Sequence, residues 1–108
     1  MRNTNAKQEF LEEIQNKELV CAKIGIDKTD GGRKIKWFYL KNNYSKEDFY
    51  DFCNKLDFGY DDGYGIQELY GTILFKDSYS DRFVYDGSEC WDYHKIPTIE
   101  QVLKEEIK

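Results

Sequence analysis

Cys90, Asp92 and His94 have side chains suited to nucleophilic or acid–base chemistry, and they alternate along one predicted strand. Every second residue of a strand lies on the same face, so these three side chains are expected to share one. A thiol and its base must approach to about 3 Å for proton transfer. At ~3.3 Å per residue, Cys90 and His94 lie ~13 Å apart on the strand. We therefore expect no catalytic cysteine and a protein that is not an enzyme. The alternative is a small enzyme of unknown class that uses His94.

The segment from Asp57 to Glu68 has the length of a calcium-binding loop and has acidic residues at its first, fifth and twelfth positions. Its third residue, Gly59, offers no side-chain oxygen, and Asp62 occupies the sixth position, where the turn requires glycine. Gly63 and Gly65 lack the lysine of a phosphate-binding loop and lie beside acids that would repel phosphate. We expect a glycine-rich connection here, and no metal or cofactor.

The cysteines Cys21, Cys53 and Cys90 lie far apart in the sequence, without a C-x-x-C pair and with a single histidine. This pattern supports neither a disulfide framework nor a zinc site, and predicts buried, reduced thiols. The sequence also lacks an apolar run long enough for a signal peptide or for the ~18 residues of a membrane span. We expect a cytoplasmic protein.

The length of 108 residues fits one domain, residues 1–108, and an aromatic content of 17% supplies bulky groups for its core. The net charge is -5, but its distribution is uneven. Residues 1–43 hold nine basic and six acidic residues, whereas residues 44–94 hold four basic and twelve acidic ones. This acidic character disfavours direct contact with nucleic acid or with an anionic membrane.

Hydrophobic periodicity predicts two or three helices. Apolar residues recur three or four positions apart from Asn5 to Lys17 and again from Ser45 to Leu56, where Ser45 offers an N-cap hydroxyl. A third helix is predicted after Pro97, where Thr98 and Gln101 form a capping-box pattern.

Alternating hydrophobicity predicts about five strands. Their ranges are Leu19 to Ile26, Lys34 to Lys41, Leu69 to Lys76, Arg82 to Tyr85 and Glu89 to His94. The connections are too short for parallel crossovers, and Asp30-Gly31-Gly32 suits a hairpin turn, so an antiparallel sheet is expected. The predicted fold is α+β, in the order α-β-β-α-β-β-β-α.

Tyrosines interspersed with aspartates mark the acidic part of the sequence. Tyrosine is enriched at protein interfaces, whereas stacking on nucleic-acid bases normally needs a basic groove. We expect a non-enzymatic binding surface that presents carboxylates and phenol rings to a basic protein. In the alternative interpretation, the acidic residues only keep the protein soluble and the aromatic rings only favour strand formation. The predicted binding residues are Asp57, Tyr60, Asp61, Asp62, Tyr64, Asp77, Tyr79, Asp81 and Asp86.

The stretches YGIQELYGTILF from Tyr64 to Phe75 and YDGSECWDY from Tyr85 to Tyr93, with Ile96-Pro97, resemble a family of small proteins borne by phages and prophages of low-GC gut bacteria. The resemblance covers about half the chain and provides no activity that could be assigned to this chain. In the family a tryptophan is expected where this chain has Cys90, which argues further against a shared nucleophile. The resemblance implies an inhibitor that binds a host factor, such as a nucleic-acid-binding or defence protein. A toxin-immunity protein is a further alternative.

Overall fold

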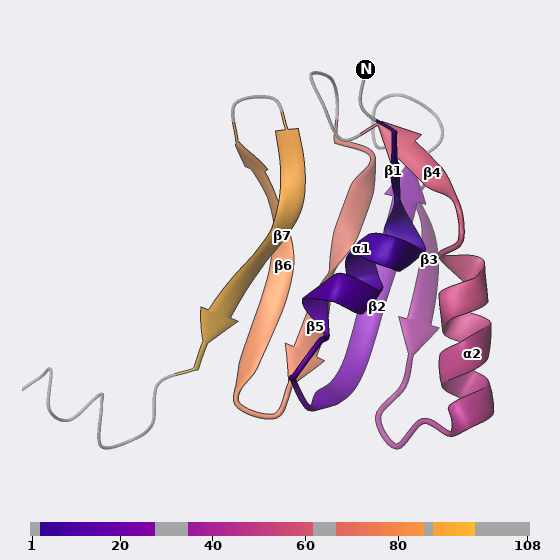
Figure 1. The fold of residues 1–108 in the computed structure, drawn as a ribbon, viewed down its shortest axis with the longest axis vertical. Coiled ribbons are helices and arrows are strands. Elements are labelled where there is room, and N and C mark those ends of the chain that lie inside the picture. The colour runs from indigo at the N-terminus through magenta and orange to yellow at the C-terminus, as the bar shows by residue number, and fades with distance from the viewer. Residues whose placement is uncertain (1–2, 28–34, 62–66, 86–87, 97–108) are drawn as a thin grey trace, which may run out of the picture.

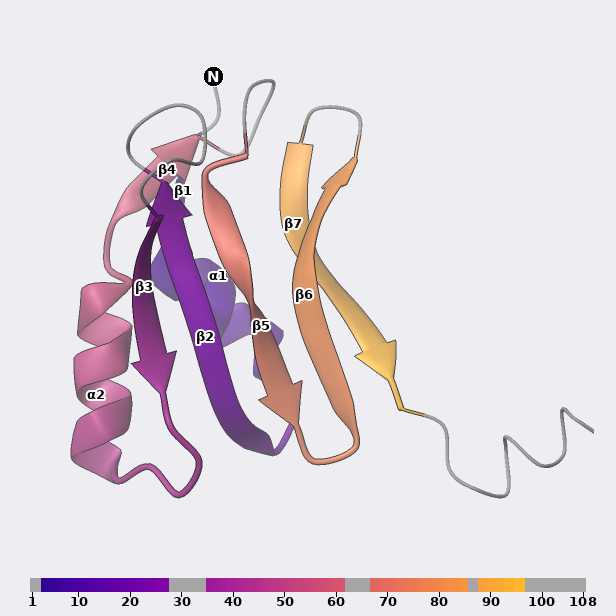
Figure 2. The same ribbon diagram turned by 180° about the vertical axis from the view of Figure 1, so that it is seen from behind.

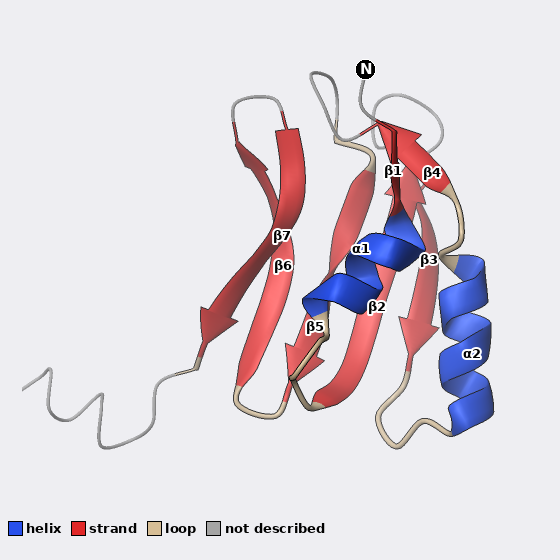
Figure 3. Ribbon diagram, viewed as in Figure 1, coloured by secondary structure: helices blue, strands red, loops and turns tan. Residues whose placement is uncertain are grey.

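The computed structural model describes residues 3–27, 35–61, 67–85 and 88–96, which form two helices and seven strands. The helices are α1 (Ala6–Glu13) and α2 (Lys46–Lys55). The strands are β1 (Asn3–Asn5), β2 (Leu19–Asp27), β3 (Ile35–Leu40), β4 (Gly59–Asp61), β5 (Leu69–Phe75), β6 (Ser78–Tyr85) and β7 (Ser88–Lys95). A five-stranded antiparallel sheet has the order β3-β2-β5-β6-β7, and β1 pairs with β4 in a second, small sheet (Figure 3). The predicted α+β class is confirmed.

The helices cover the large sheet unequally. Helix α1 crosses one face, over β2 and β5, and α2 stands beside the edge strand β3 (Figure 1). Seen from behind, the other face carries neither of the two described helices (Figure 2). We call this second face the open face.

Both helices begin where the sequence offers an N-cap. The Asn5 side chain accepts a hydrogen bond from the Gln8 backbone nitrogen at 3.0 Å and starts α1. At α2, Ser45 and Asp48 form a reciprocal capping box. Helix α1 ends at Glu13, before the predicted Lys17.

The hydrophobic core lies between α1 and the sheet. Residues at alternate positions of β2 and β5 point towards α1, as period-two patterning requires. The ring of Phe10 on α1 meets the ring of Phe52 on α2 edge to face, at a centroid distance of 5.3 Å. The largest fully buried core side chains are Phe10, Ile24, Leu56, Leu69, Ile73 and Phe75.

Two details differ from the predicted elements, and two predicted elements are not tested. The expected connection after α2 contains β4, which pairs with β1, and the Ala6 backbone nitrogen donates to the Phe58 carbonyl at 2.9 Å. Strand β6 begins at Ser78 rather than at the predicted Arg82, because the turn after β5 is short. The predicted turn at residues 30–32 and the predicted helix after Pro97 lie outside the described residues.

Strand β6 pairs with β5 over only part of its length. The pairs run from Phe75 opposite Ser78 to Thr72 opposite Asp81, whereas the pairing with β7 continues to the end of β6. At the start of β5, the buried Glu89 carboxylate accepts hydrogen bonds from the backbone nitrogens of Glu68 and Leu69, at 2.9 and 3.0 Å. A side chain of β7 thus satisfies backbone donors that β6 does not reach.

Candidate functional site

The open face gathers aromatic, aliphatic and charged side chains on one surface. Residues opposite one another in an antiparallel pair point to the same side of the sheet. The register therefore aligns Tyr39, Lys23, Thr72 and Asp81 across the strands β3, β2, β5 and β6. The open-face side chains include Lys23, Trp37, Tyr39, Tyr70, Thr72, Leu74, Tyr79, Asp81, Phe83, Cys90, Asp92 and His94.

Large apolar groups on this face contact solvent. Tyr39 is 60% exposed, Phe83 is 45% exposed and Leu74 is 37% exposed. At the β2–β3 end, the Lys23 ammonium lies 4.2 Å from the centroid of the Trp37 ring, within the range of a cation–π contact. An exposed apolar surface interspersed with charges is typical of an interaction site.

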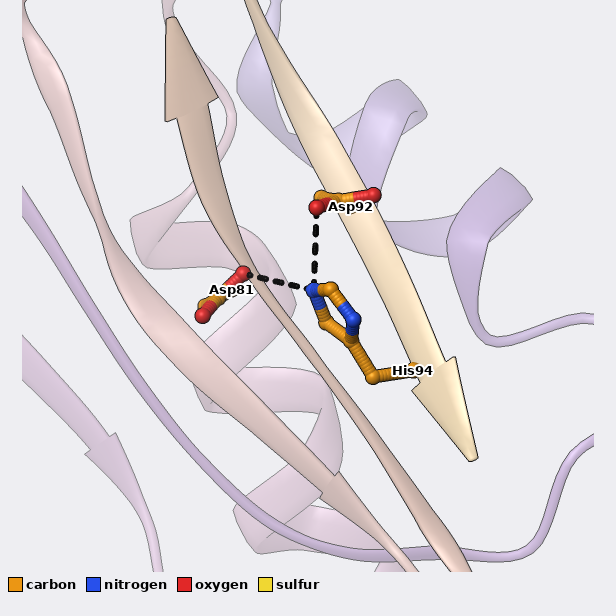
Figure 4. A group of neighbouring side chains, drawn as sticks. All are labelled: Asp81, Asp92 and His94. Carbon is orange, nitrogen blue, oxygen red and sulfur yellow. Dashed lines mark ion pairs between the residues drawn. The ribbon is translucent and has the colours of Figure 1, made fainter. Parts of the chain in front are cut away.

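At the β6–β7 end, two carboxylates meet the imidazole of His94 (Figure 4). The Nε2 atom of His94 lies 2.9 Å from Oδ2 of Asp92 and 3.4 Å from Oδ1 of Asp81. The His94 ring stacks on the Tyr79 ring, with a centroid distance of 5.0 Å and an interplanar angle of 25°. We call Asp81, Asp92 and His94 the Asp-Asp-His cluster.

Cys90 also lies on the open face, and the described residues around it have a net effect that raises the pKa of its thiol. Cys90 is exposed, so the expectation that every thiol is buried is wrong for this cysteine. Cys21 is half-buried, and only Cys53 is buried as expected. Partial desolvation raises the pKa of the Cys90 thiol, nearby Arg82 lowers it, and the carboxylates of Asp92, Glu9 and Glu13 raise it. A raised pKa disfavours the thiolate that a nucleophile needs.

A second polar cluster lies beneath α1, on the opposite face of the sheet. The guanidinium of Arg82, 2% exposed, lies 2.8 Å from Glu89 and 3.2 Å from Glu9. It also donates to the Tyr60 hydroxyl at 2.9 Å, and that hydroxyl donates to Glu9. The guanidinium carbon lies 4.8 Å from the centroid of the Trp91 ring. This cluster ties α1 and β4 to the β6–β7 hairpin from within.

The structure corrects the prediction for Tyr60. The ring is 3% exposed and belongs to the core beneath α1, so it cannot present itself to a partner. Burial raises the pKa of Tyr60 well above its ordinary value; Arg82 opposes the rise and Glu9 adds to it. The sequence shows only a tyrosine among glycines and aspartates, because Glu9 and Arg82 are remote from it in the chain.

The other predicted binding residues fall at separate places. Tyr79 and Asp81 lie together on the open face, while Asp77 is exposed in the turn between β5 and β6. Asp57 is exposed after α2, where it accepts a hydrogen bond from Asn5 at 3.0 Å. Asp61 pairs through its backbone in β4. Residues outside the described ranges are Asp62, Tyr64 and Asp86.

The structure adds four residues to the predicted pair of Tyr79 and Asp81. These are Leu74, Phe83, Asp92 and His94. Alternation along one strand already places Asp92 and His94 on one side, but only the β6–β7 register brings Asp81 opposite Asp92. The sequence alone does not reveal this register, so it could not predict that Asp81 joins Asp92 and His94.

Comparison with protein-family models, with curated proteins and with solved structures finds no match for this chain. Among the helices that the structure describes, neither is long and apolar enough to cross a membrane. The open face is therefore the structural basis for any function assigned to the chain.

Proposed function

We propose that this protein is a non-enzymatic, cytoplasmic binding module that receives a basic protein on its open face. The observation that carries the proposal is a five-stranded sheet with one face that neither described helix covers. On this face Tyr79 and Phe83 flank Asp81 along β6, Leu74 lies opposite Tyr79, and Asp92 lies opposite Asp81. Exposed apolar anchors supply most of the affinity of an interface, and charges around them supply orientation and association rate.

Charge favours a basic partner over other proteins. Asp81 and Asp92 lie on the face itself, the turn beside it carries exposed Asp77 and exposed Lys76, and Lys23 lies at the far end. The whole chain carries a net charge of -5. A positive surface would be steered towards the β6–β7 end, and salt would weaken this attraction.

The resemblance to phage and prophage proteins supports a host factor as the partner, and an inhibitor as the role. An acidic face can occupy the basic channel of a nucleic-acid-binding or defence protein without contacting nucleic acid itself. The partner is therefore best sought by affinity capture from a host lysate at low and at moderate salt, followed by binding kinetics with the purified protein.

The decisive comparison separates the open face from the rest of the surface. Truncating both Leu74 and Phe83 to alanine is expected to weaken binding of the purified partner by about tenfold or more, mainly through faster dissociation. Replacing Asp81 and Asp92 with asparagine, in the presence of a chelator, is expected to slow association and to flatten its salt dependence.

Helix α2 provides matched controls, because Tyr50 is 71% exposed there and Asp51 is also exposed. Tyr50→Ala and Asp51→Asn are expected to leave both rate constants unchanged. Binding that responds to the α2 variants, and not to those of the open face, would refute the proposal.

A further inference from the structure

We infer that the Asp-Asp-His cluster binds a divalent transition-metal ion, with Zn²⁺ as the best match. The inference goes beyond the proposed function, because the metal would bind the isolated chain without any partner. Asp81 on β6 and both Asp92 and His94 on β7 supply the ligand atoms from strands that are hydrogen-bonded to each other.

The distances suit a small ion. One nitrogen of His94 and one oxygen from each aspartate lie within 4.8 Å of one another. Bonds of about 2.0–2.2 Å in a tetrahedral zinc site place neighbouring ligand atoms about 3.3–3.6 Å apart. The His94 nitrogen lies 2.9 and 3.4 Å from its two carboxylate neighbours, so small side-chain rotations would complete the geometry. Figure 4 shows Nε2 directed at both carboxylates.

Electrostatics also favours a cation here. Asp81 and Asp92 are directly opposite in the β6–β7 register, a position in which like charges destabilise a strand pair. A divalent ion would neutralise both carboxylates and bind the unprotonated Nε2.

The Tyr79 ring is an independent feature that prepares the site. It stacks on the imidazole at 5.0 Å and restricts the plane in which His94 can turn. A ligand whose orientation is already restricted loses less conformational entropy when the metal binds.

The ligand types indicate the class of metal. Imidazole nitrogen suits Zn²⁺, Co²⁺ and Ni²⁺, whereas Mg²⁺ and Ca²⁺ prefer oxygen ligands throughout. Three protein ligands leave a fourth tetrahedral position for water. The three side chains are 40–46% exposed, so solvent reaches this position.

His94 provides a direct readout, because it is the only histidine in the sequence. Nuclear magnetic resonance of the full chain would follow its imidazole signals during a titration with Zn²⁺, with Mg²⁺ as the comparison ion. We expect a saturable shift at one Zn²⁺ per chain and no shift with Mg²⁺. The double variant Asp81→Asn, Asp92→Asn is expected to lower the Zn²⁺ affinity by about tenfold or more.

Two matched variants exclude other sources of binding. Cys90→Ala removes the exposed thiol of the same strand face, and Asp51→Asn together with Asp57→Asn removes two exposed acids elsewhere. Both are expected to keep the wild-type affinity, and backbone amide spectra would check that every variant is folded.

Imidazole signals that do not shift in a large excess of Zn²⁺ would overturn the inference. So would undiminished affinity in the double aspartate variant, or affinity that is lost with Cys90. Because the titration contains no partner, failure here leaves the docking experiment unaffected, and failure of docking leaves the metal titration unaffected.

Discussion

Arg82 is a buried cation with three hydrogen-bonded partners, and these come from three different elements. Glu9 belongs to α1, Tyr60 to β4 and Glu89 to β7. Removing one partner from a buried ionic group leaves an uncompensated charge, which costs far more than an exposed ion pair is worth. The cluster therefore contributes to the position of α1 on the sheet, and changes within it should act on stability rather than on binding.

Tyr60→Phe tests this cluster through its pH dependence. Near pH 7 the variant is expected to lose about 1–2 kcal/mol of unfolding free energy, because Glu9 and Arg82 lose a hydrogen-bond partner. The raised pKa of Tyr60 means that the folded state keeps its phenol proton when the unfolded state, with a pKa near 10, has lost it. The stabilisation by Tyr60 is thus complete below about pH 10 and declines above it.

Urea unfolding of the wild type and the variant, at neutral pH and above pH ~10, provides the measurement. The difference between them should shrink as the pH rises. Tyr50→Phe, at an exposed ring of α2, should leave the profile unaltered. A difference that stays constant or grows with pH would contradict the assigned role of the Tyr60 proton.

Single residues were the least accessible to sequence analysis. Tyr60 lies in a run of glycines and aspartates that resembles an exposed loop, and its partners Glu9 and Arg82 are 51 and 22 positions away. Asp92 and His94 could be placed on one face from alternation alone. The partner Asp81 could not, because it depends on how two strands align.

Among the elements, β5 contains the most constrained backbone position. Gly71 has a φ of +145°, and a Cβ atom added there would lie 2.2 Å from the Lys23 carbonyl oxygen of β2. The neighbouring strand cannot move away without losing its pairing in the middle of the sheet. Gly71 is therefore required both for its conformation and for its lack of a side chain.

Gly71→Ala is expected to lower the unfolding free energy by about 3 kcal/mol or more, since the clash and the backbone strain add. The neighbouring Thr72 is exposed on the open face, and Thr72→Ala should cost less than half as much. Chemical denaturation of the two variants would measure both changes. Equal stability of Gly71→Ala and the wild type would show that β2 and β5 can separate locally at no cost.

The elements were more predictable than the residues wherever apolar periodicity was strong. Both described helices follow from it, whereas the antiparallel pairing of β2 with β3 was predicted from the short connection and its glycine-containing turn sequence. The first half of β6 was missed because its buried positions, Ser78 and Ser80, are polar. Ser80 is accommodated by a hydrogen bond of 2.6 Å to Glu13 on α1, which no local pattern reveals. Strands β1 and β4 have three residues each, too few for alternation to be recognised.

At the scale of the whole molecule, the β6–β7 hairpin is attached less firmly than the centre of the sheet. Strands β2 and β5 each pair on both sides and lie beneath α1, whereas β7 pairs with β6 alone among the described strands. The second half of β6 has no β5 residue paired to it. Local opening follows such differences in packing and pairing.

Native-state amide hydrogen exchange is therefore expected to be slowest in β2 and β5 and faster in the hairpin from Arg82 onwards. Mass spectrometry of peptides or resonance spectra of single amides would measure these rates. If the hairpin proved as protected from exchange as β5, the buried Arg82 cluster would compensate fully for the absent pairing between β5 and the second half of β6. That outcome would contradict the expected order.

The position of the acidic residues is also a property of the whole molecule. The sequence places an excess of acids between residues 44 and 94 but cannot show which of them share a surface. Asp81 and Asp92 come together on the open face, whereas Asp57 and Asp77 lie at the end of α2 and at the β5–β6 turn. The distribution depends on the fold, which also determines which side of the sheet α1 covers.

The exposed thiol of Cys90 gives the open face an experimental handle. It lies opposite Phe83 in the register. Because Cys21 is half-buried and Cys53 is buried, a maleimide dye under mild conditions should label Cys90 first. Because desolvation contributes to the raised pKa of this thiol, labelling would be fastest in slightly alkaline buffer. The native chain thus carries a labelling site on the open face. Fluorescence from a dye at this site could follow partner binding without an engineered cysteine.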